Sequence, residues 1–195
     1  MKIIEPSVDL VDNVNYADIC NKIERCGRVC YQSEPKGKPE DFIRRLIKRG
    51  HESVLEHVSL TFHIICDRAI QNELVRQRLS SPSVESTRYV KYDELTFIKP
   101  ALKVNDTYSL TNFLIYVEDF YKMLIENGNK PEDARAVLPL CLKSELYMTA
   151  NLREWRHILK LRTDAKAHPQ MRFVAGKVLE IFRNNYPVFV EDISS

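Results

Sequence analysis

The sequence predicts an α+β domain in which helices cover a small sheet. Three observations lead to this prediction. Residues 58–66 are rich in β-branched and aromatic side chains, helical periodicity recurs along the chain, and the second half is mainly helical in pattern. The expected order of helix, strand, helix, strand and then mostly helices is typical of the α+β class. With 195 residues, the chain is expected to form a single domain over residues 1–195.

The first half of the chain carries clear signals for where helices start and stop. Pro39 precedes two acidic residues, which is typical of a helix start, and Gly50 stands where a helix-ending glycine is favoured. The expected elements are a strand, or a strand with a turn, at residues 1–12, helices at 16–29 and from 39 to 50, a strand at 58–66, and a helix from near 67 to about 78.

The second half begins at Pro82, which interrupts the pattern. The alternation of residues 84–92 predicts a second strand. Helical patterns follow at 107–127, at 131–162 with breaks at Gly128 and near Pro139, and at 169–185.

Composition excludes several classes of protein. Hydrophobic residues make up 44% of the chain and charged residues 29%, and a net charge of +2 is too small to indicate a nucleic-acid coat or a membrane surface. No apolar run approaches the roughly 20 residues that span a bilayer, and the polar N-terminus does not resemble a signal peptide. A cytoplasmic protein that binds neither nucleic acid nor membrane is expected.

The cysteines indicate neither disulfides nor a metal site. There are five of them, and an odd number without a secretory signal argues against a disulfide framework. Cys26 and Cys30 share a helical spacing, but no second pair with zinc-ligand spacing follows. Buried or half-buried free thiols are therefore expected at Cys20, Cys26, Cys30, Cys66 and Cys141.

The densest polar segment is ELVRQRLSSPSVESTRY, residues 73–89. It holds five charged side chains, which are Glu73, Arg76, Arg78, Glu85 and Arg88. On a helix Glu73 would face Arg76 and Gln77, and on the strand expected next Ser86 and Arg88 would share a face. Guanidinium groups suit phosphate because their planar fork binds two oxygens together. An anion pocket and a solvated helix end with surface ion pairs both remain open.

A second polar segment is NLREWRHILKLR, residues 151–162. Helical spacing places Arg153 and His157 together. Another stripe of the helix consists of Asn151, Trp155, Ile158 and Arg162. An arginine on such a stripe is half-buried and needs a partner. Three partners remain possible for Arg162. It could pair with an internal carboxylate, extend past Trp155 to reach solvent, or bind an anion.

The segment HESVLEH, residues 51–57, suggests metal ligation only superficially. It lacks the spacing that would place two histidines one helical turn apart, whereas Ser53 and Glu56 have the spacing of a capping box. Arg135 stands beside an apolar run and by itself indicates nothing. No glycine-rich phosphate loop or nucleophile elbow is present, so a phosphate is expected to be held mainly by side chains.

Taken together, these segments resemble the flavin-dependent thymidylate synthases over nearly the whole chain. The family motif RHRxxSxxxxSxRY is matched by Arg76, Gln77, Arg78, Ser81, Ser86, Arg88 and Tyr89. CGRVCYQSE, RGHESVLEH, FHIICDRAIQNELVRQR and LRTDAKAHPQMR are also similar to family segments. The resemblance implies the thymidylate synthase-complementing fold. It also implies a homotetramer whose active sites are shared between subunits.

The resemblance also implies which residues bind ligands. It assigns dUMP contacts to Glu73, Arg76, Val84, Glu85, Ser86, Thr87, Arg88, Arg135 and Arg162. Among these, Arg162 matches the arginine that polarises the uracil ring near N3, so it is the catalytic candidate. FAD contacts fall on Ser53, Arg76, Gln77, Arg78, Asn151, Leu152, Arg153 and His157. His51 matches a histidine at the entrance where folate or nicotinamide docks.

The implied reaction is reductive methylation of dUMP to dTMP. FAD is the cofactor, NADPH the reductant and 5,10-methylenetetrahydrofolate the one-carbon donor, and no cysteine nucleophile is required. Two positions depart from the motif. Gln77 replaces the central histidine and cannot carry positive charge, and the middle Asn-Glu pair becomes Ser83-Val84 with a glutamate displaced to Glu85.

Alternative functions are a flavin- or nucleotide-binding protein with impaired turnover, and a flavoenzyme acting on another pyrimidine nucleotide. An RNA-binding module is less consistent with the sequence, because aromatic residues are not interleaved with the arginines.

Overall fold

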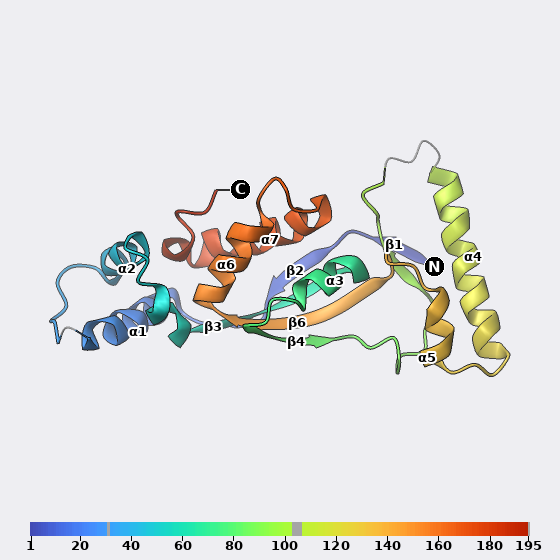
Figure 1. Ribbon diagram of the computed structural model, residues 1–195, viewed down its shortest axis with the longest axis horizontal. Coiled ribbons are helices and arrows are strands. Elements are labelled where there is room, and N and C mark those ends of the chain that lie inside the picture. The colour runs from blue at the N-terminus through green and yellow to red at the C-terminus, as the bar shows by residue number, and fades with distance from the viewer. Residues whose placement is uncertain (31, 103–106, 195) are drawn as a thin grey trace. The chain divides into compact units, whose positions relative to one another are not determined.

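The computed structural model confirms the α+β class (Figure 1). It describes residues 1–30, 32–102 and 107–194, so Tyr31 of the CGRVCYQSE segment lies outside the described residues. None of the helices in these ranges combines the length and apolarity needed to cross a bilayer.

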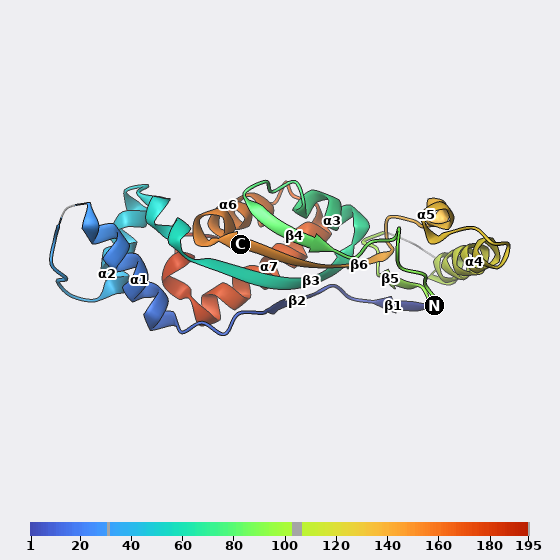
Figure 2. The same ribbon diagram turned by 90° about the horizontal axis from the view of Figure 1, so that it is seen from below.

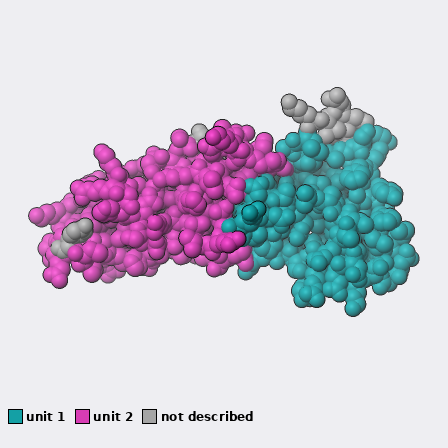
Figure 3. Space-filling view, in the orientation of Figure 1, with its two compact units in different colours: residues 1–7, 64–76, 83–146 teal, residues 8–63, 77–82, 147–195 magenta. Residues whose placement is uncertain are grey.

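The chain folds into two compact units, each built from several stretches of sequence (Figure 3). Unit 1 consists of residues 1–7, 64–76 and 83–146, and unit 2 of residues 8–63, 77–82 and 147–195. Each unit has its own buried side chains, described below. The assignment of residues 1–195 to one domain stays a prediction.

The strands form two sheets. β1 (Lys2–Ile4) pairs in parallel with β5 (Thr96–Ile98), with Ile3 opposite Phe97. The second sheet has four strands in the order β2 (Ser7–Leu10), β3 (Ser59–Asp67), β6 (Lys143–Asn151) and β4 (Ser80–Val84). Figure 2 shows β3, β6 and β4 side by side. The predicted strand at residues 58–66 and the strand with a turn at residues 1–12 are thus confirmed.

The helices before the second half match their predicted bounds closely. α1 (Tyr16–Val29) begins where the side chain of Asn15 accepts hydrogen bonds from two backbone amides. α2 (Pro39–Lys48) is followed by Gly50, whose φ of 73° is a conformation that glycine adopts without strain. A 3₁₀ turn, η1 (Glu52–His57), leads from there into β3.

α3 (Arg68–Leu74) is shorter than predicted. Asp67 caps its start by accepting a hydrogen bond from the amide of Ile70 at 2.7 Å. The helix stops at Leu74 because the chain must turn before β4 begins at Ser80. Arg76 and Gln77 both follow the helix end, so the helical spacing predicted between them and Glu73 is wrong.

The strand predicted at residues 84–92 is also wrong. β4 covers the preceding Ser80–Val84, and the ladder ends with the amide of Glu85 donating to the carbonyl of Glu145 at 2.8 Å. The chain then turns, because the amides of Tyr89 and Val90 both donate to the carbonyl of Ser86. The Ser86 hydroxyl accepts a further bond from the amide of Arg88 at 3.3 Å, as serine often does in turns. Ser86 and Arg88 therefore do not share a strand face.

The largest error of prediction concerns residues 131–162. Only α5 (Pro131–Ala134), the 3₁₀ turn η2 (Arg135–Val137) and α6 (Leu152–Arg162) are helical, and residues 143–151 form β6. Every second residue of β6 is buried: Ser144, Leu146, Met148 and Ala150. This two-residue period fits a sheet with one covered face. The packing overrides the good helix propensity of leucine, methionine and alanine.

The remaining helices agree with prediction. α4 (Thr107–Glu126) ends before Gly128, whose φ is 89°. α7 (Pro169–Asn185) has the predicted bounds and is followed by the 3₁₀ turn η3 (Pro187–Phe189).

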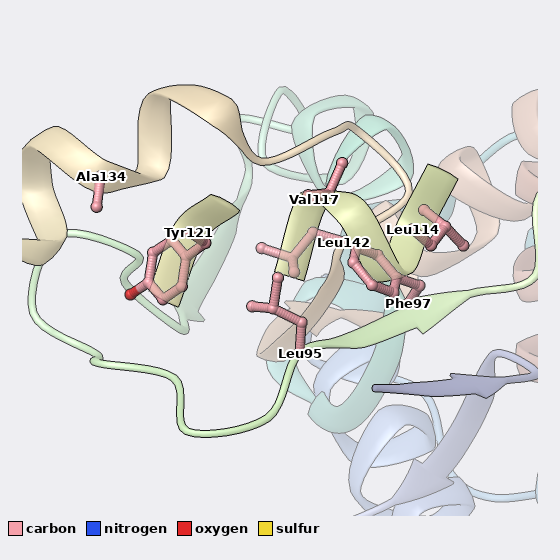
Figure 4. Packing of buried hydrophobic residues seen from close by; sticks show 7 residues of the cluster. All are labelled: Leu95, Phe97, Leu114, Val117, Tyr121, Ala134 and Leu142. Atoms are coloured by element: carbon pink, nitrogen blue, oxygen red, sulfur yellow. The ribbon is translucent and has the colours of Figure 1, made fainter. Parts of the chain in front are cut away.

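In unit 1, the helices α4 and α5 pack against β5 and the chain before β6. Figure 4 shows the buried side chains that meet there, which are Leu95, Phe97, Leu114, Val117, Tyr121, Ala134 and Leu142. Ala134, next to Arg135, packs in the same cluster as Leu95 and Phe97. The cluster therefore fixes the turn of Arg135 against the segment that leads into β5.

In unit 2, α6 and α7 lie over β3 and β6 (Figures 1 and 2). The ring of Phe62 in β3 contacts Trp155 of α6 edge-on at 4.8 Å and Phe182 of α7 at 5.7 Å, both measured between ring centroids. The indole nitrogen of Trp155 donates to the carbonyl of Leu60 at 2.9 Å, so the polar atom of this buried ring is satisfied. These contacts fix the rotation of α6 on the sheet.

Candidate active site

A cleft of about 700 Å³ opens in unit 2 beside α6. Three predicted FAD residues, Asn151, Arg153 and His157, line it. The complete lining consists of Glu52, Glu56, Leu79, Asn151, Arg153, Glu154, His157 and Lys160. The cleft is thus bounded by η1, by the chain after α3, and by the face of α6 that runs from its start to Lys160.

The start of α6 directs side chains toward this cleft. The side-chain oxygen of Asn151 accepts a hydrogen bond from the amide of Glu154 at 2.8 Å, which caps the helix. Trp155 and Ile158 of the predicted stripe are buried, its ends Asn151 and Arg162 are half-buried, and Leu152 is buried beside them. Arg153 and His157 consequently lie exposed on the other side, so their predicted pairing on one face agrees with the structure.

Glu56 connects the 3₁₀ turn to this helix. Its carboxylate accepts a hydrogen bond from the Arg153 guanidinium at 2.5 Å, and both side chains are about half exposed. The predicted capping box of Ser53 and Glu56 is therefore wrong, because the turn at residues 52–57 has no side-chain cap. His51 and Ser53 are exposed on either side of Glu52 in the sequence, and neither belongs to the lining of the cleft.

The residues of the arginine motif differ in burial. Arg76 and Arg78 are exposed, whereas Gln77 between them is buried, with 8% of its surface accessible. The backbone carbonyl of Gln77 accepts a hydrogen bond from the Ser80 hydroxyl at 2.5 Å. Leu79, next to Arg78, is 74% exposed and lines the cleft.

Sequence reasoning missed several residues of the cleft. Lys160 lies three residues after His157 and so shares its helical face, which is a signal that could have identified it. No comparable signal marks Leu79, because nothing in a local pattern predicts that a leucine stays exposed. Glu52 and Glu154 also line the cleft.

Two predicted dUMP arginines meet at one glutamate in unit 1. The carboxylate of Glu132 in α5 accepts a hydrogen bond from Arg88 Nε at 2.8 Å, and its backbone carbonyl accepts one from Arg135 Nε at 3.1 Å. The Arg88 and Glu132 side chains are 56% and 35% exposed, so the pair is open to competing anions. Glu132 was not predicted, although it lies three residues before Arg135, the spacing of a helical neighbour.

Glu85 is held inside unit 1. The Tyr92 hydroxyl donates to its carboxylate at 2.7 Å, and Lys143 Nζ lies 2.8 Å from its other oxygen. Burial and this carboxylate raise the pKa of Tyr92, so the phenol stays protonated as a donor. Val84 ends β4, and Thr87 is buried within the following turn.

The predicted dUMP residues divide between the units. All lie in unit 1 except Arg162, which is the half-buried last residue of α6 and lines a separate pocket of about 330 Å³ in unit 2. Glu73 is half-buried on α3. The predicted FAD residues lie in unit 2 except Arg76.

Burial raises the pKa of the most deeply buried thiols. All five cysteines are free, and burial raises the pKa of Cys20 to about 11 and that of Cys66 to about 12, so both thiols are protonated at neutral pH. Cys26 and Cys141 are half-buried, but Cys30 is exposed at the end of α1, where the prediction of burial is wrong. Among the described residues, no three potential metal ligands gather.

Comparison with known proteins places the chain in a family. The sequence profile described as "Thymidylate synthase complementing protein" matches residues 10–188. A "Probable flavin-dependent thymidylate synthase" of Mycobacterium phage D29 is 35% identical over 191 residues, covering 87% of this chain and 81% of that protein. The "Flavin-dependent thymidylate synthase" of Pyrococcus horikoshii is 31% identical over 188 residues, covering 92% and 77%.

The fold is also found in solved structures. The crystal structure of "a UMP/dUMP methylase PolB from Streptomyces cacaoi bound with 5-Br dUMP" has a TM-score of 0.82 and 28% identity, covering 98% of this chain and 96% of that one. The likeness extends over the whole fold, and the sequence matches extend over most of the chain. The chain therefore belongs to the family of flavin-dependent thymidylate synthases.

Proposed function

We propose that this protein catalyses the reductive methylation of dUMP to dTMP, with FAD as cofactor, NADPH as reductant and 5,10-methylenetetrahydrofolate as one-carbon donor. The observation that carries the proposal is the cleft at the start of α6, where Asn151, Arg153 and His157 meet in a chain of this family. A cytoplasmic location agrees with five cysteines that form no disulfide.

The cleft fits part of a flavin dinucleotide. Its volume of about 700 Å³ lies within the range of roughly 300–1,000 Å³ that is usual for cofactor sites. A dinucleotide carries a pyrophosphate. Glu52, Glu56 and Glu154 also line the cleft, so the attraction for an anion comes locally from Arg153, Lys160 and the N-terminal end of an 11-residue helix. Bound there, FAD would supply the redox chemistry that no amino-acid side chain provides.

The protein's own groups position the nucleotide and stabilise charge. Arg88 and Arg135 would bind the dUMP phosphate in exchange for Glu132, because a doubly charged phosphate is a stronger partner than one carboxylate. Arg162 would stabilise negative charge on the uracil ring by opposite-charge proximity. The raised pKa values of Cys20 and Cys66 agree with a reaction that needs no thiolate.

The direct test is release of tritium from dUMP labelled at ring carbon 5. Protein loaded with FAD should release tritium only when NADPH and methylenetetrahydrofolate are both present, and labelled UMP serves as the parallel substrate. Release from UMP but not from dUMP would redirect the proposal to another pyrimidine nucleotide. Binding of FAD and dUMP without release would leave a binding protein and contradict the proposed catalysis.

A further inference from the structure

Arg156 is a buried cation in the middle of α6 that the proposed chemistry does not use. Only 1% of its surface is accessible. Its Nη1 donates to Asp192 Oδ1 at 2.7 Å and also to the carbonyl of Phe189, and its Nη2 donates to Asp192 Oδ2 at 2.8 Å and to Glu52 Oε1 at 3.1 Å. A buried charge is costly unless it is paired in good geometry, and here a planar fork receives two carboxylates.

One partner of Arg156, Glu52, belongs to the wall of the cleft, whereas Asp192 and Phe189 lie outside its lining. Glu52 lines the cleft from η1, and α6 supplies Arg153 and His157 from the opposite side. Lys160, one helical turn after Arg156 and itself in the lining, lies 3.9 Å from Glu52 and 3.3 Å from Asp192. Two cations and two carboxylates thus form a closed charge network within unit 2.

This network differs from an ordinary surface ion pair. The Glu56–Arg153 pair also connects η1 to α6, but its side chains are about half exposed, so it contributes little stability. The Arg156 side chain is 1% exposed, and its fork has one geometry in which all three partners are satisfied. The distance between the two cleft walls therefore depends on Arg156 more than on the outer pair.

We infer that Arg156 is a positioning residue for the flavin cleft: through Glu52 it holds the 52–57 turn at the spacing from α6 that the bound cofactor requires, and Asp192 of the C-terminal segment fixes the orientation of its guanidinium. The inference rests on the proposed function for the identity of the ligand. It concerns a residue that does not itself line the cleft, so it acts through its neighbours.

Adjacent residues of the C-terminal segment provide a matched pair of variants. Asp192 pairs with Arg156, whereas Glu191 pairs with Arg44 of α2 through two hydrogen bonds of 2.8 Å. Neither carboxylate lines the cleft. Asp192→Asn therefore weakens the network, and Glu191→Gln removes an ion pair from the same segment without touching the network.

The decisive measurement is FAD affinity by flavin fluorescence, well below the unfolding temperature of each variant. Asp192→Asn should weaken FAD binding about tenfold, the size expected for loss of a charge-assisted hydrogen bond, and Glu191→Gln less than about twofold. Arg156→Lys, which keeps the charge but loses the fork, should weaken binding as well. Equal FAD affinity in wild type and Asp192→Asn would overturn the inference, even if both variants lose stability.

Hydrogen exchange separates this inference from the proposed function. In the flavin-free full chain, Asp192→Asn should accelerate amide exchange in residues 52–57, whereas Glu191→Gln should not. If wild type takes up no FAD, the proposed function fails, and the exchange comparison still decides whether the network positions this turn. Unchanged exchange at residues 52–57 in Asp192→Asn would overturn the positioning role independently of any ligand.

Discussion

Arg162 and Arg88 occupy different environments and should affect different kinetic parameters. Arg162 is half-buried at the end of α6, where a charge acts more strongly on a bound ring, whereas the Arg88 side chain is 56% exposed. Arg162→Ala should lower kcat roughly ten- to a hundredfold even at saturating dUMP. Arg88→Ala should mainly raise the KM for dUMP, because a contact made equally in ground and transition states contributes to binding.

Steady-state kinetics of both variants, with Arg162→Lys as the control for fork geometry, check this difference. Arg162→Lys should recover only part of the activity, since an ammonium keeps the charge but cannot present two parallel N–H donors as a guanidinium does. Normal turnover of Arg162→Ala at saturating dUMP would make this arginine structural.

Gln77 occupies the place of the motif histidine and is buried. Gln77→His is expected to raise FAD affinity or turnover. A buried imidazole is held neutral by desolvation, so the gain would come from ring shape and hydrogen bonding rather than from charge. Flavin titration and tritium release measure the two effects, and Gln77→Asn controls for the loss of side-chain length. No change in Gln77→His would show that another group already supplies the support.

Asp192 should make the fold sensitive to acid. Hydrogen bonds from Arg156 lower the pKa of this carboxyl from 3.8 to about 2. A carboxyl whose pKa is lowered by folding stabilises the fold above its unfolded pKa, and the contribution is lost as the pH falls through about 2. The free energy of unfolding should therefore decline between about pH 4 and pH 2, and less steeply in Asp192→Asn. Urea unfolding across this pH range measures the slope, and identical slopes would contradict the assignment.

At the scale of elements, the capped start of α6 fixes the position of the side chains that line the cleft. Asn151→Ala removes the cap that accepts the Glu154 amide and should cost about 1 kcal/mol of unfolding free energy. Asn151→Asp keeps an acceptor at the same place and should retain the stability. Chemical denaturation compares the two. If Asn151→Asp is stable and binds FAD normally, Asn151 acts only as a cap; weak binding would mean that the cofactor also requires a neutral side chain at this place.

The helices and strands differ in how far local sequence predicts them. α1, α2 and α7 have their own caps, glycine stops or proline starts, and their predicted bounds agree with the structure. β6 and β4 carry no such local mark. Each becomes a strand because a strand distant in sequence provides its backbone hydrogen-bond partners. The carbonyl of Glu145, for example, accepts from the amide of Glu85.

At the scale of the whole molecule, the division of candidate residues between the units leads to a test of assembly. Arg88 belongs to unit 1 and Arg162 to unit 2. If the protein is a tetramer whose active sites combine residues from different chains, mixing and reassembling Arg88→Ala with Arg162→Ala should restore sites that contain neither substitution. Assayed at dUMP far below the KM of Arg88→Ala, where both separate variants are slow, the activity of the mixture should exceed their sum by several-fold.

Sedimentation with detection of flavin absorbance should show one species of four chains. A monomer that retains FAD and full activity, or a reassembled mixture with no recovered activity, would contradict the shared-site proposal. Reassembled wild type controls for losses during the procedure.

The family and the general class were predictable from local residue patterns alone. The arginine motif, the LRTDAKAHPQMR segment and the helical face of Arg153 and His157 are all continuous in sequence, and the family assignment is confirmed. Helix caps act within a few residues, so α1 and α7 could be delimited from the same information.

The pairings that shape the candidate site were decided by folding in three dimensions. Arg156 binds Asp192, 36 residues away in the sequence, and Glu52, 104 residues away. Pairs so far apart in the sequence cannot be predicted from the pattern of neighbouring residues. The same holds for β6, whose helix-favouring residues became a strand because burial of every second side chain on one face was available only within the sheet. Local periodicity is a weak prior, and a remote partner that satisfies a buried charge or a backbone ladder outweighs it.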